Sequence, residues 1–183
     1  VEDTLKIREF IEQHHPRSAV LAGGGFIGVE LMENLRELGI DVTVVQRPRQ
    51  LLNPLDADMA AFLHTQLRQK GVHLHLGRTV EGFAADGDRV NVLIKDAAPL
   101  TADMVVLAIG VTPDTALARD AGLELGIKGS IVVNDRMETS APDIYAVGDA
   151  VQVKHFVTGQ DTLLSLAGPA NKQGRIAADN ICG

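Results

Sequence analysis

Six consecutive residues, Gly23-Gly24-Gly25-Phe26-Ile27-Gly28, satisfy the pattern G-x-G-x-x-G. They follow an apolar stretch that is expected to form a strand, and they open an expected helix. In this context the pattern indicates dinucleotide binding. Gly23 would permit the tight turn, Gly25 would let the backbone approach a pyrophosphate, and Gly28 would let helix and strand pack closely. The helix N-terminus would offer its unpaired N–H groups to the phosphates. The alternative is a glycine-rich turn that binds no ligand.

The end of the second expected strand bears on which nicotinamide cofactor this turn would take. A NAD site usually has an acidic residue here for the ribose hydroxyls, but this sequence has Gln46. An amide can bond a hydroxyl without repelling a 2′-phosphate, and Arg47 and Arg49 just beyond it could pair with such a phosphate. The pattern favours NADPH, or tolerance of both cofactors. The alternative is that both arginines are solvated loop charges.

Periodic apolar patterns predict the elements that position these residues. The expected helices cover residues 3–14, 26–38 and 56–70, and the expected strands cover 18–22, 42–45, 72–76, 80–84, 90–94 and 104–109. This order predicts an α/β fold, a Rossmann-like three-layer domain with a parallel sheet and a β-meander. The side chains expected to point inward are Ile27, Leu31, Leu35 and Leu38 in the second helix and Met59, Phe62, Leu63 and Leu67 in the third.

The remainder of the chain has a different pattern, and we expect a domain boundary that separates residues 1–114 from 115–183. The elements expected after it are a short amphipathic helix at 115–121, strands at 131–133 and 144–146, and a final helix at 169–181. Two strands and one clear helix make a poor independent core for about 70 residues.

Two segments of the chain resemble motifs of the FAD-dependent pyridine nucleotide–disulfide oxidoreductases. Residues 139–150, TSAPDIYAVGDA, resemble the family's second FAD motif, in which Gly148 and Asp149 would follow a buried strand and Asp149 would hold the ribityl chain. Residues 106–114, VLAIGVTPD with Gly110, resemble the segment that closes the NAD(P)H domain. The resemblance therefore implies an NAD(P)H-binding domain at 1–114 and the C-terminal part of a split FAD domain at 115–183.

The final helix resembles the branch that contains coenzyme A–disulfide reductases and NADH oxidases. It begins within residues 166–178, LAGPANKQGRIAA, and its N-terminus, with Ala167, Gly168 and Ala170, would lie near the flavin's pyrimidine edge. There the helix dipole would stabilise a reduced, anionic ring. The alternative is an ordinary helix whose small residues serve close packing.

The resemblance also suggests roles for two residues of the glycine-turn helix. Phe26 would cover the flavin until nicotinamide displaces it, and Glu30 would lie near the nicotinamide carboxamide. Without the resemblance, Phe26 would be a packing residue and Glu30 a first-turn acid that complements the helix dipole.

The function that the resemblance implies is hydride transfer from NAD(P)H to FAD and on to a disulfide, thiol or oxygen acceptor. The redox cysteine, the first FAD fingerprint and the dimerisation domain of the family are not in this sequence, which begins with Val1 and has Cys182 as its single cysteine. We therefore expect an inactive middle section of a homodimeric parent enzyme, with Cys182 incidental. The sequence leaves open the acceptor and the alternative of a non-catalytic NAD(H) sensor.

Composition limits the other classes of function. A net charge of −7 argues against a nucleic-acid surface, and no apolar run approaches the roughly 20 residues that cross a bilayer. His73 and His75 share a strand face but lack a third metal ligand, and no arrangement of nucleophile, base and acid suggests hydrolysis. With one cysteine and no visible signal peptide, we expect a cytoplasmic protein.

Overall fold

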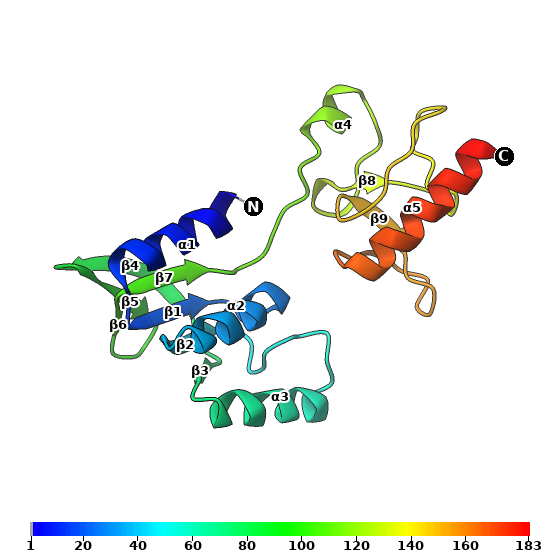
Figure 1. The fold of residues 1–183 in the computed structure, drawn as a ribbon. Helices are drawn as coiled ribbons and strands as arrows, with labels where there is room; N and C mark the ends of the chain where they lie inside the picture. Colours follow the sequence, from blue (N-terminus) through cyan, green and yellow to red (C-terminus); the bar gives the residue numbers. More distant parts are fainter. Residues whose placement is uncertain (1) are drawn as a thin grey trace. The chain divides into compact units, whose positions relative to one another are not determined.

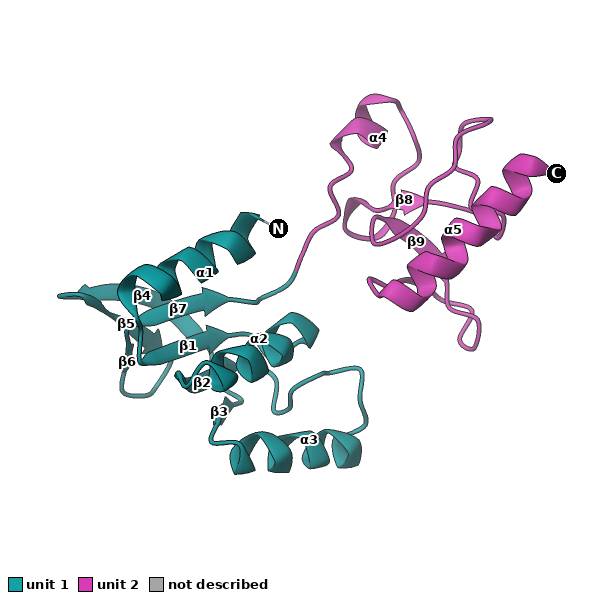
Figure 2. Cartoon of the chain, viewed as in Figure 1, with its two compact units in different colours: residues 1–110 teal, residues 111–183 magenta. Residues whose placement is uncertain are grey.

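The computed structural model describes residues 2–183, which form two compact units (Figures 1 and 2). The first unit ends at Gly110 and the second begins at Val111, whereas the sequence suggested a boundary after residue 114. No sheet is shared between the two units, and we describe each unit by itself.

The first unit is built on a parallel sheet of four strands in the order β3-β2-β1-β7. Apolar strands of four to six residues joined by helical crossovers form such sheets, as the sequence predicted. The sheet strands are β1 (Ser18–Ala22), β2 (Asp41–Gln46), β3 (His73–Leu76) and β7 (Met104–Leu107). The helices of this unit are α1 (Glu2–His14), α2 (Phe26–Glu37) and α3 (Ala57–Gln69).

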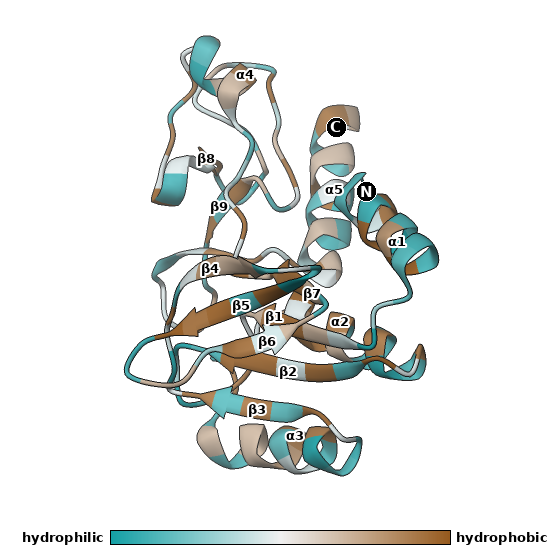
Figure 3. Ribbon diagram, turned by 90° about the vertical axis from the view of Figure 1, so that its left-hand side faces the viewer, coloured by the Kyte–Doolittle hydropathy of each residue, from teal (hydrophilic) through white to brown (hydrophobic). Residues whose placement is uncertain are grey.

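A three-stranded antiparallel meander, β4 (Val80–Asp86), β5 (Arg89–Ile94) and β6 (Leu100–Ala102), forms a second sheet. The sequence predicted the first two strands but missed β6, because three residues are too short to display a period of two. Figure 3 shows the hydrophobic colouring of β5 and β6 beside that of β1 and β2.

Alternation along the central strands creates the three layers. In β1, Ala19 and Leu21 belong to a core cluster that also receives side chains from α1, α2 and α3. Val20 and Val45 belong to a second cluster, with Val92 and other residues of the meander. Because successive side chains of a strand point to opposite faces, the helices cover one face of the parallel sheet and the meander covers the other. The predicted α/β fold of three layers is confirmed.

The inward faces of two helices differ from the prediction. Ile27 and Leu38 near the ends of α2 are exposed, as are Met59 and Phe62 of α3, and Phe62 is 73% exposed. Leu35 and Leu67 are buried as predicted, and Leu31 and Leu63 are partly buried against the same core. The structure also buries Gly28 and Met32 in α2 and Ala60 in α3, which were not predicted to point inward. A helix on a sheet buries one narrow stripe, so only positions spaced by about four and seven residues reach the core.

The second unit contains a short mixed sheet in the order β10-β9-β8, in which β8 and β9 are parallel and β9 and β10 antiparallel. The elements of this unit are α4 (Ala116–Asp120), a 3-10 turn at Ile127–Gly129, β8 (Ile131–Val132), β9 (Val151–Lys154), β10 (Asp161–Leu163) and α5 (Ala167–Cys182).

One sequence prediction for this unit is wrong, and two of its strands were not predicted. Residues 144–146 form no strand, because only one isolated bridge pairs Tyr145 with Glu138. The strands β9 and β10 were missed, since each has only three or four residues and includes polar side chains.

Asp103 connects the start of β1 to the meander through hydrogen bonds and an ion pair. Its carboxylate accepts hydrogen bonds from the backbone N–H groups of Arg17 and Ser18, at 2.8 and 2.9 Å, and pairs with Arg89 at 3.1 Å. Burial acts to raise the pKa of Asp103, but the hydrogen bonds from Arg17 and Ser18 and the charge of Arg89 outweigh it and lower the pKa. The ionised form is therefore the one that stabilises the fold.

We expect Asp103→Asn to lower the free energy of unfolding by about 1–2 kcal/mol near neutral pH, because charge-assisted hydrogen bonds are lost. The lowered pKa makes this contribution complete above the ordinary aspartate pKa and lost as the pH falls through the lower, folded-state value. Urea unfolding near neutral pH and at about pH 3 should therefore show a smaller difference in acid. The exposed Asp88→Asn serves as the control, and an equal difference at both pH values would contradict the assignment.

Candidate functional site

The glycine turn between β1 and α2 brings three backbone segments close together. Gly23 has φ +111°, donates its N–H to the Val45 carbonyl at 2.9 Å, and would place a Cβ 2.2 Å from the Ala108 oxygen. A Cβ at Gly28 would lie 2.2 Å from the Gly23 oxygen. Both positions therefore need glycine for the packing of the fold itself.

Gly25 is different, because nothing in the described fold requires a glycine there. Its φ of −78° and ψ of −169° suit any residue, and a Cβ at this position would meet no atom within 4 Å. Gly25 is the N-cap of α2, is exposed, and has no side chain that could cap the helix, so no side chain of its own covers this helix N-terminus. An uncapped helix N-terminus without a Cβ above it is suited to an anion such as a pyrophosphate.

Gln46 ends β2 with its side chain turned towards the glycine turn. Its Oε1 accepts from the Gly24 N–H at 3.0 Å, and its Nε2 donates to the Gln50 carbonyl at 3.3 Å. The amide thus joins the turn to the loop after β2, a role that the sequence did not reveal. An acidic side chain could accept from Gly24 but could not donate to Gln50.

Arg47 and Arg49 lie on the loop that follows Gln46, and both are exposed. Within residues 2–183, no ion pair involves either of them. The segment after β3 joins this loop, since Gly77 donates to the Pro48 carbonyl at 2.9 Å and Arg78 donates its backbone N–H to Gln46 at 3.1 Å. Sequence reasoning missed Arg78, although a residue just past β3 must lie near the end of the parallel strand β2.

Apolar side chains are exposed where α2 begins. Phe26, the first residue of the helix, is 47% exposed, and Ile109 beyond β7 is 77% exposed. Glu30 is also exposed, one turn along the helix. Gly110 has φ +122° and ends the unit with open space around it. Phe26 is therefore only partly a packing residue within this unit.

In the second unit, the Gly148–Asp149 turn is attached to α5. The Gln173 side chain is only 7% exposed, and its Oε1 accepts the Gly148 N–H at 2.7 Å. Asp149 is exposed in the turn that leads into β9. The expectation that a buried strand precedes Asp149 is wrong, because the residues before it have no regular partner strand. The sequence did not single out Gln173, since an isolated glutamine on a helix carries no pattern.

The N-terminus of α5 is open in the same way as that of α2. The helix begins at Ala167, its N-cap Leu166 makes no side-chain bond, and Ala167 and Gly168 are exposed. A Cβ at Gly168 or Gly174 would meet nothing within 4 Å. Packing within this unit therefore does not explain why glycine occupies either position. Ala170, one turn into the helix, is half-buried.

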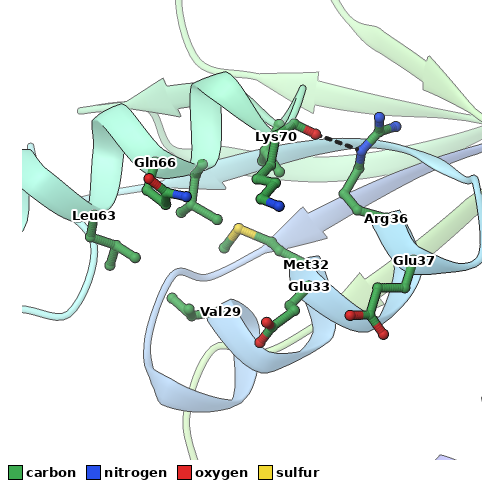
Figure 4. Close-up of a pocket in the computed structure, with 10 residues that line it drawn as sticks. Val29, Met32, Glu33, Arg36, Glu37, Leu63, Gln66 and Lys70 are labelled. Atoms are coloured by element: carbon green, nitrogen blue, oxygen red, sulfur yellow. Dashed lines mark hydrogen bonds between the residues drawn. The ribbon is translucent and has the colours of Figure 1, made fainter.

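A cavity of about 430 Å³ lies between α2 and α3 (Figure 4). Val29, Met32 and Leu63 contribute apolar lining, and Arg36 donates to the Lys70 carbonyl at 3.1 Å across its end. The cavity includes no residue of the glycine turn, so we assign it no cofactor.

Within residues 2–183, no group of three or more His, Cys, Asp or Glu side chains could hold a metal ion. Among these residues no helix is both long and apolar enough to cross a membrane. Cys182 is a free, exposed thiol.

Comparison with known proteins identifies the family. Residues 2–174 match the family model described as pyridine nucleotide-disulphide oxidoreductase, and the chain belongs to this family. A relative described as NADH oxidase, from Methanocaldococcus jannaschii, is 38% identical over all of this chain and 41% of its own length. The structure of reduced CoADR-RHD from Bacillus anthracis is 46% identical, with a TM-score of 0.91 over 99% of this chain and 32% of that one. The chain thus spans about two fifths of the curated relatives it matches.

One solved relative bears on cofactor choice. It is an engineered water-forming NADPH oxidase bound to NADPH, 30% identical, with a TM-score of 0.85 over 95% of this chain and 39% of that one. Its parent is the water-forming NADH oxidase from Lactobacillus brevis, solved with NADH. Among its five substitutions, an aspartate becomes alanine, the next residue becomes arginine, and a glycine eighteen residues before the aspartate becomes alanine.

Two glycine substitutions should separate folding from ligand binding. Gly23→Ala should lower the free energy of unfolding by about 2–3 kcal/mol, because the added Cβ meets a backbone oxygen at a positive φ. Gly25→Ala should leave stability within about 0.5 kcal/mol but weaken nicotinamide-cofactor binding by about tenfold, since its Cβ fills the space for a pyrophosphate. Urea unfolding and calorimetry measure the two effects. Unchanged binding by Gly25→Ala would show that the open space is not used.

Gln173→Leu should lower the free energy of unfolding by about 1–2 kcal/mol, because the Gly148 N–H loses its partner. Hydrogen exchange at the Gly148 amide should become faster, as measured by NMR. The exposed Gln160→Leu is the control. Equal exchange in both variants would mean that Gln173 does not hold the turn.

Proposed function

We propose that the chain is the NAD(P)H-binding portion, with part of the FAD domain, of a flavoprotein oxidoreductase. The observation that carries this proposal is the uncapped N-terminus of α2 at Gly25, which the fold leaves open where a pyrophosphate would bind. The flavin, when bound in the whole enzyme, would accept hydride from the nicotinamide and pass electrons to a disulfide, thiol or oxygen acceptor. By itself the chain is proposed to bind cofactor without turnover.

NADPH is the proposed nicotinamide cofactor. In this chain, eighteen residues also separate Gly28 from Gln46, and Arg47 follows. If this equal spacing reflects equivalent positions, Gln46 would correspond to the aspartate of the NADH oxidase and Arg47 to the arginine of the engineered NADPH oxidase. Gly28 would correspond to the glycine that the engineered enzyme replaces with alanine. The missing carboxylate and the exposed guanidinium favour a 2′-phosphate.

The second unit would supply the flavin contacts. Asp149 is exposed and can accept a hydrogen bond from a ribityl hydroxyl. The open N-terminus of α5 would place partial positive charge towards an anionic ring. In the first unit, Phe26 would cover the flavin until nicotinamide displaces it, and Glu30 would lie near the nicotinamide carboxamide. We further propose, from the family resemblance, that the whole enzyme is a cytoplasmic homodimer.

A non-catalytic NAD(H) sensor is the alternative. A sensor needs no flavin contacts, so the open, glycine-bearing start of α5 and the exposed Asp149 favour the oxidoreductase. Retention of FAD by the whole protein would separate the two functions.

We expect the purified chain to bind NADPH with micromolar affinity and more tightly than NADH, as measured by calorimetry. Arg47→Ala should weaken NADPH binding by about tenfold, because one charge-assisted phosphate contact is lost, and NADH binding by less than about twofold. Arg8→Ala, an exposed arginine on α1, is the matched control. If a folded chain bound neither nucleotide, the proposed function would be wrong; if Arg47→Ala had no effect, only the NADPH assignment would fail.

A further inference from the structure

The loop between β2 and α3, residues 47–56, has no regular secondary structure but is held at several points. Leu52 donates its N–H to the Gly24 carbonyl at 2.9 Å, and the Gln46 amide spans Gly24 and Gln50. Leu52 has φ +46°, a conformation that costs a non-glycine residue about 1–3 kcal/mol. Such a conformation persists only where the surroundings fix it, so this loop has one defined shape.

Leu51 is the centre of this loop. Its side chain is fully buried in the main core cluster, and its Cδ2 lies 2.1 Å from where a Cβ on Gly24 would stand. The Leu51 backbone N–H donates a hydrogen bond to His64 Nε2 at 3.1 Å. A displacement of Leu51 would therefore disturb both the loop and the glycine turn.

His64 on α3 must be neutral to hold Leu51. A backbone N–H can only donate, so Nε2 must carry a free lone pair and the ring proton must be on Nδ1. Burial and the charge of Arg68 lower the pKa of His64, which favours this neutral form. The hydrogen bond connects α3 to the segment that presents Arg47 and Arg49.

We propose that His64 is a positioning residue for the 2′-phosphate of NADPH, acting through Leu51 on the loop of Arg47 and Arg49. The inference rests on the proposed NADPH binding. His64 touches no cofactor itself. Its hydrogen bond to Leu51 fixes the loop, and the loop in turn fixes both arginines relative to the glycine turn.

The test is calorimetry of NADPH and NADH with the unmodified chain, His64→Leu, His64→Gln and Arg47→Ala. His64→Leu should weaken NADPH binding by about tenfold and NADH binding by less than about threefold, because the loss falls on the phosphate contacts. His64→Gln should restore NADPH binding to within about threefold, since its Oε1 can accept the Leu51 N–H. The matched histidine control is His75→Leu on β3.

A second readout is independent of cofactor. Hydrogen exchange at the Leu51 and Leu52 amides should be faster in His64→Leu and near the original rate in His64→Gln. An equal loss of both nucleotides, or no loss while Arg47→Ala still weakens NADPH binding, would overturn the role of His64 and leave the proposed function intact. Failure of the unmodified chain to bind NADPH would overturn both proposals.

Discussion

The close approach of the backbone at Gly23, Gly28 and Ala108 is the constraint on which the first unit depends. At these points β1, the start of α2 and the end of β7 come so near one another that a single Cβ would meet a carbonyl oxygen at 2.2 Å. The close approach sets where α2 starts, and therefore where its unpaired N–H groups lie. The layers around it, helices on one face and the meander on the other, keep these three segments in place.

The glycines of this turn differ in whether packing requires them. Gly23 and Gly28 are required by atoms of the chain, whereas Gly25 leaves space that no atom of the chain fills. The second unit repeats this distinction, since Gly168 and Gly174 on α5 also face open space. At these positions the chain loses the conformational entropy of a glycine on folding without a packing contact that requires one.

In each candidate site, side chains outside the sequence motif form hydrogen bonds with the backbone of the turn or loop. Gln46 and His64 connect the loop after β2 to the glycine turn and to α3, and Gln173 connects the turn before β9 to α5. Each bond satisfies a backbone N–H that has no regular partner. In each candidate site, side chains from neighbouring segments thus fix the backbone of the turn or loop.

The sequence by itself determined the family, the three layers of the first unit and the position of the glycine turn, because these depend on local periodicity and on a contiguous motif. It did not determine which faces of α2 and α3 are buried, since Ile27, Met59 and Phe62 are apolar yet lie off the stripe that meets the sheet. Nor could it find β6, β9 and β10, which are too short to show a period and exist because neighbouring strands pair with them. Only the tertiary structure decided the partners of Gln46, His64 and Gln173, because each bond joins segments brought together by folding rather than by any local pattern.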